Sequence, residues 1–170
     1  MNRKILSYGG SGGIGAATAR VLHQSGYDLH LVGRNGDRLA AVATELGAGV
    51  SIGDVLDENL FARVAEEAGD SLDGLVYAVG SINLRNLASL TVADFATDFR
   101  LNAMGAALAV QAALPALRRS PGIASVVLFS SVAAVQGFPL HASMGMAKGA
   151  VSGLTLSLAA ELASTRSPPP

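Results

Sequence analysis

The chain contains no cysteine and no tryptophan, and charged residues make up only 15% of its 170 residues. Without cysteine there are no disulfides, no thiolate metal ligands and no cysteine nucleophile. An average soluble domain has about 25% charged residues, so part of this surface is expected to be covered in a subunit interface. The net charge of −1, with no dense block of either sign, argues against nucleic-acid binding, which needs a basic face to neutralise phosphates.

Hydrophobic residues make up 50% of the chain, which excludes disorder and supplies the core of one domain. Only Ile5 and Leu6 follow the basic first residues before Ser7 and the glycines, so the apolar stretch of a signal peptide is missing. The uncharged segment Ser120–Ala147 is broken by prolines and serines, which disfavours a transmembrane helix. We therefore expect a cytoplasmic protein without a membrane partner.

Short apolar runs alternate with helical patterns along the chain. Strands separated by helices form right-handed parallel βαβ units, so we predict a doubly wound α/β fold of three layers, α/β/α. Its ligand site should lie at the carboxyl ends of the strands. Strands are expected at residues 4–8, 29–32, 50–52, 75–79 and 124–129, and helices after the glycines up to Gly26 and at 37–46, 57–68, 91–119 and 143–163.

In the first of these helices Ile14, Ala17, Val21 and Leu22 form an apolar stripe at helical spacing, a pattern typical of a core-facing side. Five strands are visible where the full dinucleotide fold has six, so the last strand or strands are expected to be missing. We predict one domain over residues 1–163. The tail 164–170 (STRSPPP) cannot continue the last helix, because consecutive prolines lack donors and clash.

A glycine-rich loop follows the first expected strand. Residues 10–15 (GSGGIG) match G-x-G-x-x-G, and Gly9, Gly13 and Gly15 form a second spacing over the same residues. Glycines permit a tight turn and a close approach to a pyrophosphate, while the helix N-terminus offers free N–H groups and a positive dipole end. Because the loop follows a strand and opens a helix, we favour nucleotide binding over a merely flexible loop.

The second expected strand ends in Gly33 and Arg34, with no acidic residue before Asp37. An acid is usual there when the ribose 2′-OH is free, whereas the planar guanidinium of arginine suits a 2′-phosphate. Arg34 therefore favours NADP(H), with NAD(H) and an ordinary solvated arginine as alternatives. Asp54, after the third strand, is either an acceptor for the adenine amino group or a helix-start residue.

Lys148 is the only charged residue between Arg119 and Glu161. A lone ammonium group in an apolar stretch must reach water, find a partner or lose its proton. Lys148 is therefore a candidate site residue. The alternative is a lysine whose stem lies on apolar surface while its amine reaches solvent.

Taken together, these motifs resemble the short-chain dehydrogenase/reductase family over residues 4–163. The glycine spacing resembles the family's cofactor loop, and Lys148 resembles the lysine of its Tyr-x-x-x-Lys motif. The resemblance implies a Rossmann-type fold, hydride transfer between a nicotinamide and a carbonyl or alcohol substrate, and no metal. It also implies catalytic roles for Ser131, which orients substrate, for Lys148, and for Asn102, the family's structural and proton-relay asparagine. Cofactor contacts are implied for Gly9, Ser11, Gly13, Ile14, Gly15, Arg34, Asp54, Val55, Ala78, Gly80 and Lys148.

The sequence departs from the family pattern at several places. Met144 stands one helical turn before Lys148, where the family has its catalytic tyrosine, and a thioether has no proton to give. His141 is a candidate substitute acid, although a histidine that caps or packs at a helix start explains it as well. Ala78 replaces the asparagine of the family's Asn-Ala-Gly motif, Tyr8 replaces the threonine that opens its loop, and the family's C-terminal part has no match.

Three interpretations follow: an NADP(H)-dependent oxidoreductase with a modified active site, a nucleotide-binding protein without turnover, and an incomplete product of a longer reading frame. The segments Leu101–Leu117 and Gly149–Ala160 are uncharged and rich in alanine. Small residues permit close helix approach, and apolar stripes of this kind would otherwise be exposed. We therefore expect a homodimer or homotetramer.

Overall fold

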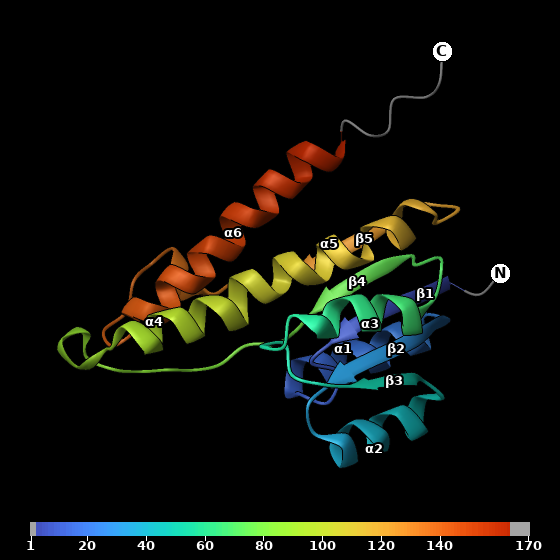
Figure 1. The fold of residues 1–170 in the computed structure, drawn as a ribbon, viewed down its shortest axis with the longest axis horizontal. Coiled ribbons are helices and arrows are strands. Elements are labelled where there is room, and N and C mark those ends of the chain that lie inside the picture. Colours follow the sequence, from blue (N-terminus) through green and yellow to red (C-terminus); the bar gives the residue numbers. More distant parts are fainter. Residues whose placement is uncertain (1–2, 164–170) are drawn as a thin grey trace. The chain divides into compact units, whose positions relative to one another are not determined.

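The computed structural model describes residues 3–163 (Figure 1). The tail 164–170, which stands apart in composition, lies outside the described residues. The chain divides into two compact units. The first comprises the residues up to Gly80 together with Gly105–Leu128, and the second comprises Ser81–Met104 and the residues from Phe129 onward.

The first unit is built on a five-stranded parallel sheet with the strand order β3-β2-β1-β4-β5. The expected strands are all confirmed, with each end displaced by at most two residues. Short apolar runs bounded by turn residues were therefore sufficient to predict the strands of this sheet. The strands are β1 (Arg3–Tyr8), β2 (Tyr27–Gly33), β3 (Gly49–Ile52), β4 (Gly74–Tyr77) and β5 (Ser125–Leu128).

The direction of winding changes beside β1. The chain runs outward from β1 to β3 and then returns to β4, on the other side of β1. Tyr8 at the end of β1 pairs with Val32 on β2 and with Tyr77 on β4, so the three strands end level with one another. The loops after these strands therefore leave the same edge of the sheet, where doubly wound folds bind their ligands.

Four helices of the first unit cover the sheet. In Figure 1, α1 (Gly13–Gln24) and α2 (Gly36–Leu46) connect the strands from β1 to β3, and the two helices contact each other. The helices α3 (Asn59–Ala68) and α5 (Gly105–Arg118) contact each other as well. With right-handed crossovers, these two pairs lie on opposite faces of the sheet. The expected three-layer α/β/α architecture is confirmed.

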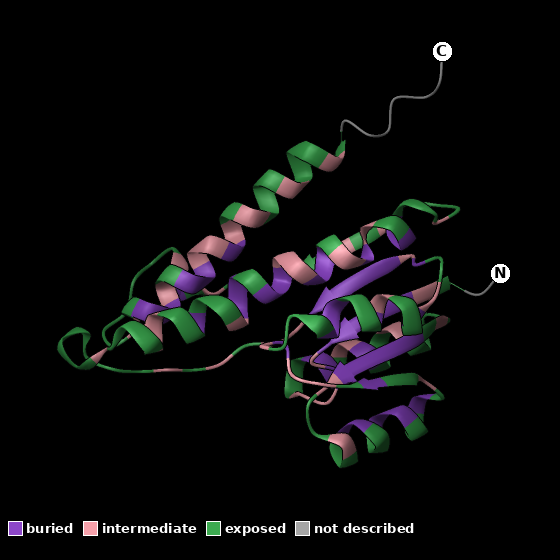
Figure 2. Ribbon diagram, viewed as in Figure 1, coloured by how far each residue is buried: buried purple, intermediate pink, exposed green. Residues whose placement is uncertain are grey.

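The core of the first unit lies on the central strands, which are purple in Figure 2. Leu6, Leu31 and Leu75 on β1, β2 and β4 are completely buried. All four residues of β4 are buried, as expected for a strand covered on both faces. In α2 the expected apolar face is also confirmed, because Leu39, Val42 and Leu46 are all buried.

The expected apolar stripe of α1 does not face the core. Ile14 and Val21 are 57% and 61% exposed, while the buried residues of this helix are Gly15, Ala16 and Ala19. The reason is steric: a Cβ at position 15 would overlap the carbonyl oxygen of Gly9, so the helix meets the loop backbone through its smallest residues. The larger apolar side chains are rotated outward.

The second unit is helical. A capping box between Thr91 and Asp94 starts α4 (Val92–Phe99), and a π-helical turn, Arg100–Met104, follows it. The single or double helix expected over residues 91–119 is thus a continuous series of α4, the π-helical turn and α5. A 3-10 turn, Val132–Ala134, precedes α6.

The long helix α6 (Ala142–Ala163) is buried only in its first half. Its buried residues recur at helical spacing and end with Val151, and Leu156 beyond them is 74% exposed. In Figure 2 the second half of this helix is mostly green. No helix among residues 3–163 is long and apolar enough to span a lipid bilayer.

A pair of valine substitutions tests which helix faces carry the core. Val64→Ala in α3 removes a completely buried side chain and should lower the free energy of unfolding by about 2 kcal/mol. Val21→Ala in α1 is the control, because Val21 is 61% exposed and alanine favours helix, so no loss is expected. Urea titrations measure both. Equal destabilisation by the two variants would contradict the outward orientation of the α1 stripe.

Candidate active site

The glycine loop turns sharply between β1 and α1. Gly9 has φ +79, a left-handed conformation that favours glycine, and its N–H donates to the Val32 carbonyl oxygen at 2.8 Å. A Cβ at Gly9 would lie 2.7 Å from the carbonyl oxygen of Ala78. The loop is therefore packed closely against the segment after β4. Two of its glycines, Gly9 and Gly15, are required by contacts within the chain itself.

The loop also leaves space at its outer side. No atom lies within 4 Å of the place where a Cβ of Gly13 would be. Gly12 is the N-cap of α1 and provides no side-chain cap, so the N–H groups of the first turn face outward without a side-chain acceptor. An open cradle at an uncapped helix N-terminus fits the pyrophosphate of a dinucleotide.

Arg34, at the end of β2, has a side chain that is 77% exposed, and its Nη1 lies 3.8 Å from Oδ2 of Asp54. The structure thus brings these two predicted cofactor residues together. Asp54 Oδ1 also accepts a hydrogen bond from the Leu56 backbone N–H at 3.0 Å, a helix-start contact. A second arginine, Arg38, donates from Nη2 to the Ser11 carbonyl oxygen at 3.3 Å. Sequence reasoning missed Arg38, although its position four residues after Arg34 was a usable signal.

The remaining predicted cofactor residues lie around the same loops. Ala78 donates its N–H to the Tyr8 carbonyl oxygen at 2.9 Å, which continues the β1–β4 pairing past the end of the strand. Gly80 is exposed, and Ile14 on the first turn of α1 is exposed as well. Val55 is buried, so its side chain belongs to the core.

Tyr8, which departs from the family's threonine, is part of the core rather than of the loop surface. Its ring is completely buried and packs against Phe61 and Tyr77, with ring centroids 5.8 and 5.7 Å away. Burial raises the pKa of the Tyr8 hydroxyl, and this hydroxyl has no hydrogen-bond partner among the described residues. A residue in this state supplies packing and no proton.

In the second unit, Lys148 lies on α6 one turn after Met144 and is only 9% exposed. Its Nζ donates to the Phe129 carbonyl oxygen at 2.8 Å. Burial lowers the pKa of the Lys148 amine, because desolvation disfavours the charged form. The Lys148 side chain therefore points inward toward the Phe129 carbonyl group and does not reach solvent.

The serines after Phe129 join this segment to α6. Ser131 is half-buried, and its Oγ accepts the Ala133 N–H at 3.2 Å, which caps the 3-10 turn. Ser130 Oγ donates to the Lys148 carbonyl oxygen at 2.8 Å. The predicted residues Ser131 and Lys148 are thus held on neighbouring pieces of chain.

Asn102 lies in the π-helical turn and is almost completely buried. Its Nδ2 donates to the Asp98 carbonyl oxygen at 2.8 Å, and its Oδ1 has no partner among the described residues. Helical distortions of this kind often occur at functional sites. The free acceptor agrees with a residue that holds a water molecule or a ligand.

Sequence reasoning missed a buried carboxylate beside these residues. Asp98 on α4 is 3% exposed and accepts hydrogen bonds from Ser81 Oγ at 3.0 Å, Asn83 Nδ2 at 3.1 Å and Ser143 Oγ at 2.6 Å. These hydrogen bonds join residues up to 45 positions apart, so no local pattern could reveal them. The one available signal was an acid one helical turn before Asn102.

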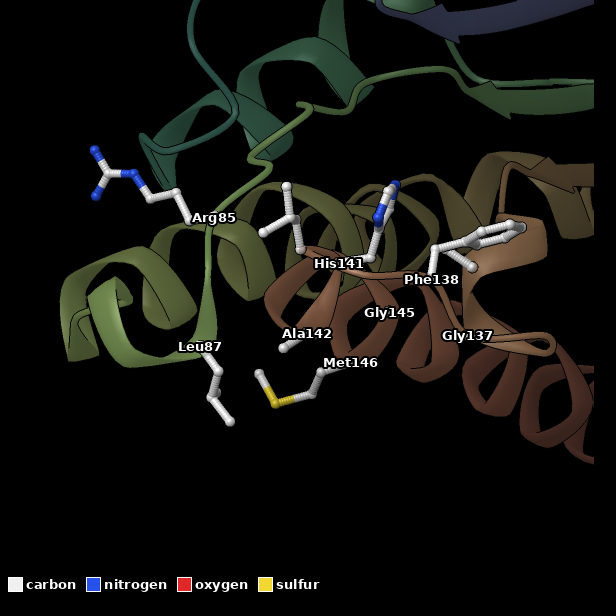
Figure 3. Close-up of a pocket in the computed structure, with 10 residues that line it drawn as sticks. Arg85, Leu87, Gly137, Phe138, His141, Ala142, Gly145 and Met146 are labelled. Atoms are coloured by element: carbon white, nitrogen blue, oxygen red, sulfur yellow. The ribbon is translucent and has the colours of Figure 1, made fainter.

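His141 lines a pocket of about 300 Å³ in the second unit (Figure 3). Its Nδ1 lies 2.7 Å from the Pro139 carbonyl oxygen, and its ring centroid lies 5.6 Å from that of Phe138. From α6 the pocket is lined by Ala142, Gly145 and Met146. With about 100° per residue, Met146 is roughly 200° around the helix from Met144. His141 precedes the first residue of α6, and Met144 is not among the residues that line this pocket.

Comparisons with known proteins agree with this geometry. A family model described as Enoyl-(Acyl carrier protein) reductase matches residues 9–167. The chain is 30% identical over 172 residues to a 3-oxoacyl-(acyl-carrier-protein) reductase of Rattus norvegicus, covering 96% of this chain and 70% of that protein. The solved structure of a short-chain type dehydrogenase/reductase from Mycobacterium ulcerans matches with a TM-score of 0.89 and 28% identity, covering 96% of this chain and 64% of that one.

Another relative is the inactive 2-(S)-hydroxypropyl-CoM dehydrogenase 2 of Xanthobacter autotrophicus, which is 36% identical over 149 residues, 84% of this chain and 64% of that protein. Together these matches show that the chain belongs to the short-chain dehydrogenase/reductase family of NAD(P)-dependent oxidoreductases. The chain spans about two thirds of the length of its relatives.

Two glycine substitutions separate the structural from the binding role of the loop. Gly15→Ala forces a Cβ into the Gly9 carbonyl group and should lower the melting temperature, because overpacking costs about 1–3 kcal/mol. Gly13→Ala enters open space and should leave the melting temperature unchanged, while its methyl group weakens cofactor binding. Thermal unfolding without cofactor, followed by NADPH titration, measures both. A stable Gly15→Ala variant would contradict the close packing of the loop.

Proposed function

We propose that this chain is an NADP(H)-dependent oxidoreductase that interconverts a small-molecule carbonyl compound and the corresponding alcohol. The observation that carries the proposal is the open glycine cradle beside two arginines, Arg34 and Arg38. Relatives named 3-oxoacyl-(acyl-carrier-protein) reductase and L-2,3-butanediol dehydrogenase support this substrate class. Catalysis by the present chain, its preference for NADP(H) and a cytoplasmic location are parts of the proposal.

The preference for NADP(H) rests on the end of β2. Arg34 follows this strand directly, and the exposed guanidinium can pair with phosphate oxygens in a planar fork. Arg38 reaches the Ser11 carbonyl group, so a second cation lies at the glycine loop. Asp54 lies 3.8 Å from Arg34 and balances part of its charge while no phosphate is bound. Two guanidinium groups in this place favour a 2′-phosphate over a free 2′-OH.

The bound cofactor would supply a hydride donor or acceptor. The outward N–H groups of the first turn of α1 would bind its pyrophosphate. In the second unit, the Ser131 hydroxyl would orient the substrate oxygen, as in the family. The inward-facing amine of Lys148 would hold a cofactor hydroxyl, and the free acceptor of Asn102 would hold a water molecule.

A second candidate function is cofactor binding without turnover. Met144 favours it, because a thioether cannot act as the general acid that the family's tyrosine supplies, and such a loss typically costs ~10²–10⁴-fold in rate. A relative whose name calls it inactive supports the same possibility. Cofactor titration combined with a turnover assay separates the two functions.

We further propose that the protein works as a homodimer or homotetramer. None of the described residues of α6 after Val151 is buried, although this half of the helix contains several leucines. One of these leucines, Leu156, is 74% exposed. Apolar surface of this kind is typical of a face covered by another copy.

The first test is a titration of the protein with NADPH, followed by cofactor fluorescence, with NADH in parallel. We expect saturable binding with NADPH preferred. Arg34→Ala should weaken NADPH binding about tenfold, equal to about 1.4 kcal/mol, and leave NADH binding unchanged. Arg20→Ala is the control, since Arg20 is exposed and pairs with Glu45 away from the loop.

Reduction of ethyl acetoacetate and oxidation of 2,3-butanediol then test turnover. Turnover of either compound supports the oxidoreductase, and binding without turnover supports the second candidate. Failure to bind both cofactors would contradict the proposed function altogether.

A further inference from the structure

The side chain in the family's tyrosine position has a hydroxyl group beside it. Ser81 Oγ lies 4.0 Å from Met144 Sδ, at the outer limit of an O–H···S contact. Ser81 belongs to the segment that follows β4 and Gly80, and it is half-buried. A proton-carrying group is therefore present at this position, although it comes from a different part of the chain.

The Ser81 hydroxyl is backed by the buried carboxylate. It donates to Asp98 Oδ1 at 3.0 Å, and Asp98 is 3% exposed. The other carboxylate oxygen, Oδ2, accepts from both Asn83 Nδ2 and Ser143 Oγ. Oδ1 therefore accepts one hydrogen bond, whereas Oδ2 accepts two. Because Oδ1 already accepts the Ser81 hydroxyl, it is the oxygen that can receive the Ser81 proton.

The other hydroxyl on the same carboxylate is not placed to meet a substrate. Ser143 is completely buried, whereas Ser81 is only half-buried. His141 is engaged with the Pro139 carbonyl group and lines a pocket whose lining does not include Met144. Among the residues named so far, Ser81 alone combines a transferable proton, contact with Met144 and a proton acceptor behind it.

We propose that Ser81 and Asp98 form a proton relay that takes the place of the family's tyrosine. The inference rests on the proposed oxidoreductase function and names its proton path. In alcohol oxidation, the substrate O–H bond breaks and its proton passes to Ser81 Oγ, while the Ser81 proton passes to Asp98 Oδ1. The carbon that carries this oxygen would give up a hydride, which the bound nicotinamide cofactor would accept, and its C–O bond would become a carbonyl. Reduction runs through the same transfers in reverse.

Ser81 is the catalytic residue of this relay, and Asp98 acts through it. Both hydroxyl protons travel along hydrogen bonds, and the carboxylate ends protonated after one oxidation. The hydrogen bonds from Asn83 and Ser143 hold the carboxylate in place, so that Oδ1 stays directed at Ser81. These two residues position the acceptor without handling the substrate proton.

Three serine variants test the relay. Ser81→Ala should lower the turnover of ethyl acetoacetate or 2,3-butanediol at least ~10²-fold, and Ser81→Thr, which keeps the hydroxyl, should restore most of it. Ser89→Ala is the matched control, because Ser89 is an exposed serine of the same unit whose hydroxyl donates to the Asn86 carbonyl oxygen and touches no relay residue. Its turnover should equal that of the unmodified chain.

A fourth variant distinguishes proton transfer from structural support. Met144→Tyr introduces the family's own proton donor, so it should restore turnover to Ser81→Ala. A purely structural role for Ser81 would not respond to this change. Turnover by Ser81→Ala equal to that of the unmodified chain would overturn the relay. Binding of NADPH without any turnover by the unmodified chain would overturn it too and leave the cofactor site intact, whereas absent NADPH binding would remove the proposed function.

An activity-free measurement checks the same contact. The chain has no cysteine, so Met144→Cys creates a single thiol beside Ser81. The Asp98 carboxylate should disfavour the thiolate and slow its alkylation by iodoacetamide at pH 7. Adding Asp98→Asn should speed the alkylation several-fold, whereas adding Ser143→Ala should not. An alkylation rate independent of Asp98 would show that the carboxylate does not act on position 144 and would overturn the relay.

Discussion

The carboxylate of Asp98 is the interaction on which the second unit depends. It lies almost completely out of solvent and joins three separate pieces of chain: the segment after β4, α4, and the first turn of α6. A buried polar group that loses a hydrogen-bond partner costs about 1–3 kcal/mol, so the three donors stabilise the carboxylate in its buried position. Through Ser143, this cluster holds the first turn of α6, the helix that carries Met144 and Lys148.

Each of the two units contains part of the residues that the family resemblance assigns to the site. The first supplies a glycine loop whose inner side is closed by its own backbone and whose outer side is open, with arginines at the end of β2 and the start of α2. The second holds the polar groups that would act on a substrate oxygen. The family's tyrosine is absent from it, yet a hydroxyl and a buried carboxylate lie beside the replacing methionine. These two contacts support the proposed relay.

Much of this fold could be predicted from the sequence, because short apolar runs and the glycine loop are local signals. The five strands, the buried face of α2 and the position of the nucleotide loop follow from residues close together in the chain. The outward stripe of α1 could not be predicted, since its orientation depends on how Gly15 meets the Gly9 carbonyl group. The Asp98 cluster could not be predicted either, because its members are distant in sequence and are related only by the tertiary fold.

The central claim is that this chain transfers hydride although methionine occupies the tyrosine position. The most direct measurement follows deuterium from NADPH labelled at C4 into the alcohol formed from ethyl acetoacetate, read by mass spectrometry. With each C4 diastereomer used in turn, we expect deuterium at the product carbinol carbon from one of them and none from the other. A protein that binds NADPH but yields no labelled alcohol with either would contradict the claim and leave only the cofactor-binding function.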